Sequence, residues 1–318
     1  MKIDRFVIAI IVTIIIAYFF PQLGSKSSPV PLDLIGTIGV SLIFFFYGLK
    51  LSPSKIKAGL KNWKLHLLVQ ATTFLIFPLI VLATKPFISS EEGESLWLSF
   101  LFLAALPSTV SSSVVMVSIA KGNVPAAIFN ASISGLIGIV ITPIWMELFI
   151  PKSTTDFDLS SIYIKLIVTI IVPVFLGILL QRFGRTFTSK YKNQLTTFDK
   201  LVILLIIYKS FVHAFEDDIF SDLSLLDFMM IAFFILALFY GVYFLTGYIA
   251  KQLHFNLEDQ ITARFCGTKK SLVHGTVFSE ILFPVTFPVG LLLLPLMLFH
   301  AMQIFIISLI ASRLGNRE

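Results

Sequence analysis

Apolar stretches of about 20 residues, separated by short polar connections, run through the whole chain, and an α-helix needs roughly that length to cross a bilayer. The predicted spans are residues 5–20, 33–50, 64–84, 96–120, 124–150, 161–182, 200–215, 226–250, 260–283 and 287–312. The pattern therefore predicts an all-α polytopic membrane protein with ten transmembrane helices. No connection is long enough for a soluble domain, and the largest, 183–199, is expected to be a short basic loop.

The ten spans divide into five plus five around the acidic segment 151–160, so residues 1–150 and 151–318 form two halves. Because each half holds an odd number of spans, the second would enter the membrane from the opposite side, and the halves would be inverted repeats. In each half the fourth span is polar and broken by proline or glycine. Paired interruptions of this kind are typical of secondary transporters, whose sites lie between the repeats near the bilayer centre.

Composition excludes a soluble fold. Hydrophobic residues make up 57% of the chain and charged residues only 13%, against about 25% charged residues in ordinary globular proteins. Mean hydropathy is +0.93. Cys266 is the single cysteine, and the five histidines are scattered. We therefore expect no intrachain disulfide, metal cluster or cofactor, and the sequence carries no nucleophile or paired-acid motif of an enzyme.

Lysine and arginine lie mainly in the connections on one side of the predicted bundle. They are Lys2, Arg5, Lys55, Lys57, Lys61, Lys64, Lys121, Arg182, Arg185, Lys190, Lys192, Lys200, Lys251, Arg313 and Arg317. The opposite connections carry Lys26, Lys85, Lys152, Glu91, Glu92, Glu94, Asp156, Asp158, Glu216, Asp217, Asp218 and Asp222. The positive-inside rule then places both termini in the cytoplasm, in a multi-pass protein of the cell's inner membrane.

The same asymmetry accounts for the net charge of +6 without a nucleic-acid partner. The first span follows Lys2 and Arg5 as a signal peptide would, but no small-residue cleavage site comes after it. We therefore expect a retained helix rather than a signal peptide.

The fourth span is interrupted at Pro107, which lacks a backbone N–H and disfavours helix at the residue before it. The hydroxyl-bearing residues around it are Ser108, Thr109, Ser111, Ser112 and Ser113. Ser108 and Thr109 are expected to cap a helix that restarts there. A helix start at membrane depth presents free N–H groups and partial positive charge, which favours an anion. The alternative is that these hydroxyl residues only allow close helix packing.

The ninth span carries two adjacent charges, which are costly at membrane depth unless the backbone opens into a protein-lined, wet or anion-containing cavity. We expect Gly267 to permit the break, Thr268 to cap the next half-helix, and Lys269, Lys270 and Ser271 to lie in its first turn. Successive residues project about 100° apart, so one lysine would face the cavity while the other snorkels or meets an acid or a carbonyl. The alternative is that both lysines lie in a cytoplasmic loop.

Other polar residues inside the predicted spans are weaker candidates for substrate contact. They are Gln70 and Thr73 in the third span, Asn130 in the fifth, and His300 and Gln303 on one face of the tenth. For each, an interhelical hydrogen bond explains the residue as well as a substrate contact does. Lys165 and Lys209 lie near span ends, where snorkelling suffices. Glu280 is either a rim residue or a proton carrier.

These residues resemble the bile acid:sodium symporter family, and within it the bacterial relatives of the divergent, SBF-like seventh member. The resemblance covers nearly the whole chain and is carried by residues 106–113, 121–123, 130–143 and 265–272. It implies two inverted five-helix repeats. It also implies a core of spans 3–5 and 8–10, in which the broken spans 4 and 9 cross, and a panel of spans 1, 2, 6 and 7.

The residues that hold sodium in that family are largely replaced. The resemblance matches the family's ninth-span glutamate and glutamine to Phe265 and Lys269, and its third-span glutamine to Thr73. The fourth-span serine–asparagine pair falls on Ser112 and Ser113, which leaves weakened sodium sites there. A lysine ammonium can stand in for sodium electrostatically, and a buried lysine can exchange a proton. The coupling ion is open between sodium and a proton.

The sequence thus predicts a secondary active transporter that carries a small organic anion across the lipid bilayer by alternating access between core and panel. The anion would lie where spans 4 and 9 cross, held by helix N-termini, serine hydroxyls and Lys269 or Lys270. Two alternatives stay open: a passive channel, and a membrane regulatory protein without flux of its own. A pore is expected to show a repeated ring or filter motif, and the sequence contains none.

Overall fold

The computed structural model describes residues 5–25, 28–50, 62–109, 111–150, 164–165, 167–218, 224–283 and 287–317, and all regular structure within these ranges is helical. Some charged positions on which the predicted orientation rests lie outside the described residues. They are Lys2, Lys26, Lys55, Lys57, Lys61, Lys152, Asp156, Asp158 and Asp222, with the side chains of Arg5, Glu91, Glu92 and Arg185. The side chain of Ser111 also lies outside, although its backbone opens a helix.

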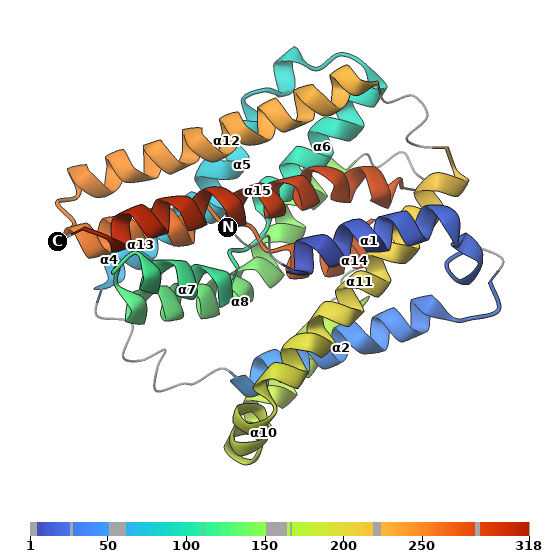
Figure 1. Ribbon diagram of the computed structural model, residues 1–318, viewed down its shortest axis with the longest axis horizontal. Coiled ribbons are helices and arrows are strands. Elements are labelled where there is room, and N and C mark those ends of the chain that lie inside the picture. Colours follow the sequence, from blue (N-terminus) through green and yellow to red (C-terminus); the bar gives the residue numbers. More distant parts are fainter. Residues whose placement is uncertain are drawn as a thin grey trace. The chain divides into compact units, whose positions relative to one another are not determined.

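The first of two compact units comprises Met1–Ser52, Pro151–Asp222 and Thr276–Leu291. Its helices are α1 (Arg5–Phe19), α2 (Leu32–Lys50), a π-helical turn η5 (Ile167–Ile171) leading into α10 (Val172–Lys190), and α11 (Lys192–Glu216). α2 packs against both α10 and α11 (Figure 1). A Cβ on Gly48 or Gly177 would lie 2.2 Å from a carbonyl oxygen of the facing helix. These glycines therefore let the α2 and α10 backbones meet, as small residues do between membrane helices.

The second compact unit comprises Pro53–Ile150, Leu223–Gly275 and Leu292–Glu318. From the first half of the chain it takes α4 (Trp63–Ala71), the π-helical turn η3 (Thr72–Ile76), α5 (Phe77–Leu82), α6 (Glu91–Ala105), α7 (Ser111–Ile119) and α8 (Val124–Phe149). From the second half it takes α12 (Leu225–Gln252), α13 (Leu257–Gly267) and most of α15 (Val289–Gly315). α13 packs against α4, α7, α8 and α12 (Figure 1). α14 (Leu272–Leu282) begins in this unit and ends in the first.

Six helices among the described residues are long and apolar enough to cross a membrane, and two shorter apolar helices accompany them. The six are Leu32–Lys50, Trp63–Phe87, Val124–Phe149, Ile167–Gly184, Leu225–Gln252 and Val289–Gly315, and the shorter ones are Ile8–Phe19 and Gly93–Ala105. Phe233 and Phe244 on α12 are each 66% exposed, as expected of side chains that face lipid. The chain is a multi-pass membrane protein, while the ten-span count and the inverted repeats stay predictions.

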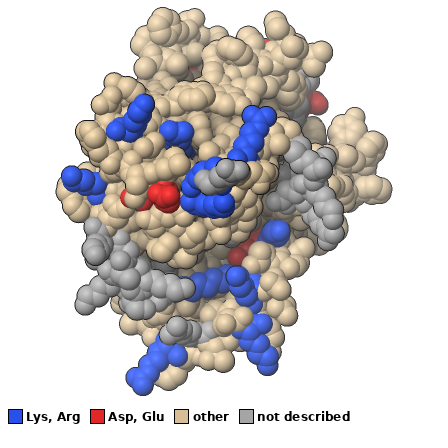
Figure 2. Space-filling model, turned by 60° about the vertical axis from the view of Figure 1, so that its left-hand side comes forward, with Lys and Arg blue, Asp and Glu red and all other residues tan. Residues whose placement is uncertain are grey.

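Basic side chains stand out on an otherwise largely uncharged face of the molecule. Figure 2 shows a face that is tan over most of its area, with lysine and arginine scattered across it and few acidic side chains. Described basic residues that are exposed include Lys64, Lys121, Arg182, Lys190, Lys192, Lys200, Lys251 and Arg313. Which side of the membrane they occupy stays a prediction of the positive-inside rule.

Both helix breaks fall where the sequence predicts them, between α6 and α7 and between α13 and α14. The second break differs from the expectation, because Lys269, Lys270 and Ser271 lie in the non-helical connection and not in the first turn of α14. The expected loop 183–199 is also wrong. Helices α10 and α11 run through it and meet at Tyr191. Both of these helices pack on α2. Asp199 of α11 lies 3.6 Å from the ammonium of Lys50, the last residue of α2.

Candidate functional site

The third span contains a π-helical turn that leaves backbone acceptors free. In η3 the Phe77 N–H donates to the Thr72 carbonyl, five residues back. The next donor in this pattern would be residue 78, but Pro78 has no N–H. The Thr73 carbonyl is therefore open to a side chain, and the Lys270 Nζ donates to it at 2.7 Å. The π-helical turn and Pro78 together thus leave one buried carbonyl oxygen free to accept from a cation.

Helix α6 ends at Ala105 inside the protein, and its last carbonyls must find donors other than helix N–H groups. The Lys270 Nζ donates to the carbonyls of Ala104, at 2.5 Å, and of Leu106, at 2.9 Å. The Thr142 hydroxyl donates to the Ala105 carbonyl at 2.8 Å. Side chains from α8 and from the second break therefore satisfy this buried helix end.

Helix α13 ends in a matching way. The Thr268 hydroxyl donates to the Arg264 carbonyl at 2.6 Å, so Thr268 closes α13 rather than capping α14, which corrects the expectation. The Ser108 hydroxyl donates to the Cys266 carbonyl at 2.7 Å. Gly267 has no left-handed backbone angle; its role is close approach, because a Cβ there would lie 3.1 Å from the Thr72 side chain.

The two breaks, residues 106–109 and 268–271, are joined to each other and to α15. The Ser271 N–H donates to the Pro107 carbonyl at 2.9 Å. The Gln303 side chain holds the Lys270 backbone at both ends: Oε1 accepts from the Lys270 N–H and Nε2 donates to the Lys270 carbonyl, each at 2.8 Å. The Gln303 amide also lies 3.2 Å from His300 Nδ1.

Lys270 and Lys269 have opposite surroundings although both are fully buried. The Lys270 ammonium has three carbonyl acceptors and lies 4.2 Å from the centre of the Phe77 ring, within the range of a cation–π contact. The Lys269 Nζ has no hydrogen-bond partner among the described residues. An ammonium carries three donors, so Lys269 leaves all of them available to a ligand.

Hydroxyl groups gather at the start of α7. The Thr109 hydroxyl lies 2.8 Å from the Ser112 hydroxyl and 2.9 Å from that of Ser113. The Ser271 hydroxyl lies 2.9 Å from His274 Nδ1. Hydroxyls paired in this way can each turn to donate to an anion or accept from a donor.

The side chains of the remaining candidates form hydrogen bonds away from the two lysine side chains. The Gln70 amide donates to Asn130 Oδ1 at 3.1 Å, and the Asn130 amide lies 2.9 Å from His66 Nδ1. The Thr73 hydroxyl donates to the Val69 carbonyl at 2.9 Å, and only its backbone carbonyl meets Lys270. For Gln70 and Asn130 the structure shows interhelical hydrogen bonds.

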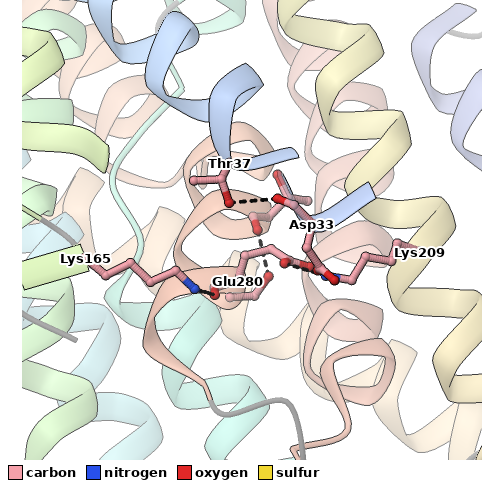
Figure 3. Close-up of polar contacts among 7 residues, drawn as sticks. Asp33, Thr37, Lys165, Lys209 and Glu280 are labelled. Carbon is pink, nitrogen blue, oxygen red and sulfur yellow. Dashed lines mark hydrogen bonds and ion pairs between the residues drawn. The ribbon is translucent and has the colours of Figure 1, made fainter. Parts of the chain in front are cut away.

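A second charged cluster lies in the first compact unit and was not expected from the sequence. Lys209 of α11 pairs with Asp33 of α2 and, at 2.9 Å, with Glu280 of α14 (Figure 3). The Lys165 Nζ donates to the Glu280 carbonyl at 3.0 Å, and the Thr37 hydroxyl to the Asp33 carbonyl at 2.8 Å. The sequence offered one signal for this cluster: a lysine and two acidic residues of opposite charge lie in three apolar spans that are far apart along the chain.

Comparison with known proteins gives the chain a family. A sequence model of the SBF-like CPA transporter family matches residues 4–316. The chain is 38% identical over 318 residues to "Uncharacterized protein PA2026" of Pseudomonas aeruginosa, an alignment that covers 99% of this chain and 94% of that protein. It is 34% identical over 314 residues to "Putative symporter YfeH" of Escherichia coli, covering 98% of this chain and 92% of the relative.

A vertebrate protein aligns over almost the same length. "Sodium/bile acid cotransporter 7" of Danio rerio is 32% identical over 311 residues, covering 96% of this chain and 92% of the relative. These matches confirm the family resemblance and the expectation of a membrane transporter rather than an enzyme. The chain belongs to the SBF-like CPA transporter family.

Proposed function

We propose that the protein is a secondary active transporter of a small organic anion that works by alternating access. The observation that carries this proposal is the buried ammonium of Lys269, whose Nζ has no hydrogen-bond partner among the described residues. An isolated buried charge costs several kcal/mol unless it is paired. A bound carboxylate, sulfate or phosphate group would supply both the opposite charge and the missing acceptors.

The hydroxyls beside the first break are proposed to complete the anion site. Thr109, Ser112 and Ser113 already contact one another, and each can redirect its hydroxyl hydrogen toward an oxygen of the ligand. Ser108, Thr268 and Ser271 would support the site through the two breaks. Ser111 stays a candidate from the sequence.

The transport movement is proposed to take place between a core and a panel. The second compact unit includes α4–α8, α12, α13 and most of α15, which supports a core built from spans 3–5 and 8–10. The first unit includes α1, α2, α10 and α11, as the panel would. Inverted five-helix repeats and cytoplasmic termini belong to this proposal. The relatives' printed names mention sodium and symport, and the coupling ion here is sodium or a proton.

Counterflow in proteoliposomes tests the proposal. Vesicles holding the purified protein are loaded with unlabelled taurocholate, or with one of a panel of organic carboxylates and sulfates, and diluted into the labelled compound. A carrier accumulates label transiently, a channel only equilibrates it, and a regulator moves none. Lys269→Gln should abolish counterflow. Lys251→Gln, which changes an exposed lysine at the end of α12, should leave it intact. Equilibration without overshoot, or no flux of any panel compound, would contradict the proposal.

A further inference from the structure

The surroundings of the Lys270 head group suit a cation better than a neutral amine. Its Nζ lies 2.5–2.9 Å from the carbonyl oxygens of Thr73, Ala104 and Leu106, which we call the carbonyl cage. An ammonium has three N–H donors and no acceptor, so the cage satisfies it completely. A neutral amine has only two N–H donors, and its lone pair would face the third carbonyl oxygen.

The carbonyl cage is made by the backbone and does not depend on the lysine. The Thr73 carbonyl is free because η3 shifts the hydrogen-bond pattern by one residue and Pro78 cannot donate. The Ala104 and Leu106 carbonyls are free because α6 ends there. The C-terminus of a helix also carries partial negative charge. Without the Lys270 side chain, three oxygens would still converge on one buried point beside the Phe77 ring.

Three converging backbone carbonyls in a buried place are the kind of surroundings that replace the hydration shell of a monovalent cation. We infer that the Lys270 ammonium is a built-in cation, tethered in a carbonyl cage that would otherwise take a free monovalent cation from solution. The protein therefore needs no added sodium to hold the two breaks together. This inference goes beyond the proposed function and stands whichever ligand Lys269 binds.

Chemical rescue of a truncated lysine tests it. Lys270→Ala removes Cγ, Cδ, Cε and Nζ, which n-propylammonium replaces atom for atom. Thermal unfolding of the purified protein in detergent is measured in about 0.15 M choline chloride, a physiological ionic strength. The measurement is repeated in sodium chloride and in n-propylammonium chloride. We expect Lys270→Ala to melt several degrees below wild type in choline, and to recover most of that loss in n-propylammonium and part of it in sodium.

Two matched variants exclude non-specific salt effects. Lys270→Met removes the charge but fills the space, so it should melt low and respond to added cations no more than the wild type does. Lys269→Ala removes the neighbouring charge. Because no carbonyl cage surrounds the Lys269 head group, this variant should show no specific cation response. The wild type and Lys270→Met should gain equally from sodium over choline, because a side chain fills the carbonyl cage in both. This comparison tests the inference even if Lys270→Ala does not fold.

A wild-type protein that gains more from sodium over choline than Lys270→Met does would overturn the inference. So would a Lys270→Ala variant that gains no more from n-propylammonium or sodium than Lys270→Met does. Neither readout uses a transported substrate, so failure here is distinct from failure of counterflow.

Discussion

At the scale of single residues, backbone hydrogen bonding separates the roles of two adjacent lysines. Gln303 satisfies the N–H and the carbonyl of Lys270, and the carbonyl cage satisfies its side chain. Lys269 is equally buried, and its Nζ has no hydrogen-bond partner in the described part of the chain. The first lysine is therefore fully bonded within the protein, and we propose that the second binds the ligand.

Replacing Gln303 by leucine should destabilise the protein through the Lys270 backbone. The backbone N–H and the backbone carbonyl of Lys270 would both lose their partner, and an unsatisfied buried polar group costs about 1–3 kcal/mol. We expect the melting temperature in detergent to fall by several degrees. Gln252→Leu, at the exposed end of α12, should leave it unchanged. If Gln303→Leu melts at the wild-type temperature, the Gln303 bonds do not hold the break.

Among the elements, the π-helical turn η3 supplies one of the acceptors of Lys270. Pro78 has no N–H to donate, so the Thr73 carbonyl stays open for the Lys270 ammonium. Proline inside a helix ordinarily costs about 3 kcal/mol relative to alanine. Pro78→Ala should nevertheless fail to stabilise the protein, because a restored N–H would compete with Lys270 for the carbonyl.

Pro295→Ala provides the comparison for Pro78→Ala, since Pro295 also lies inside a helix, α15. It should be neutral or stabilising in thermal unfolding. A Pro78→Ala protein that melts as high as Pro295→Ala would show that the carbonyl cage does not depend on the π-helical turn.

The ion cluster of Figure 3 joins α2, α11 and α14 within the first unit. Lys209→Met should lower the melting temperature, because the Lys209 side chain is 14% exposed and Glu280, 24% exposed, would keep an unpaired carboxylate. Asp33→Asn should cost little, since the Asp33 side chain is 80% exposed. Adding Glu280→Gln to Lys209→Met should restore part of the loss. Equal effects of Lys209→Met and Asp33→Asn would contradict a role for the Lys209–Glu280 pair.

At the scale of the whole molecule, each compact unit draws segments from both halves of the chain. The charge asymmetry of the connections predicts how these segments cross the membrane. A cysteine at Asp217 should react with an impermeant maleimide added to intact cells, and a cysteine at Lys192 should react only after lysis. The native Cys266 is buried and should stay silent. External labelling at Lys192 would contradict the ten-span, inverted-repeat topology.

The sequence predicts both breaks and the apolar helices around them, because hydrophobic runs, Pro107 and the polar residues beside them are local signals. It missed the helical structure of 183–199, because those residues are polar and basic. It could not predict which lysine is paired. The acceptor at Thr73 is 197 residues away from Lys270 in sequence and becomes free only through the local geometry of η3. The Lys209 cluster was missed for the same reason, since its partners come from helices far apart along the chain.

Lys269 is proposed to bind a small organic anion, and native mass spectrometry of the gently purified protein can detect that ligand. The wild-type protein should carry a small acidic compound that accurate mass and fragmentation identify. Lys269→Met should lose that compound, while Lys251→Met, altered on an exposed surface, should retain it. A wild-type protein without any such compound, or one that Lys269→Met retains equally, would contradict the claim.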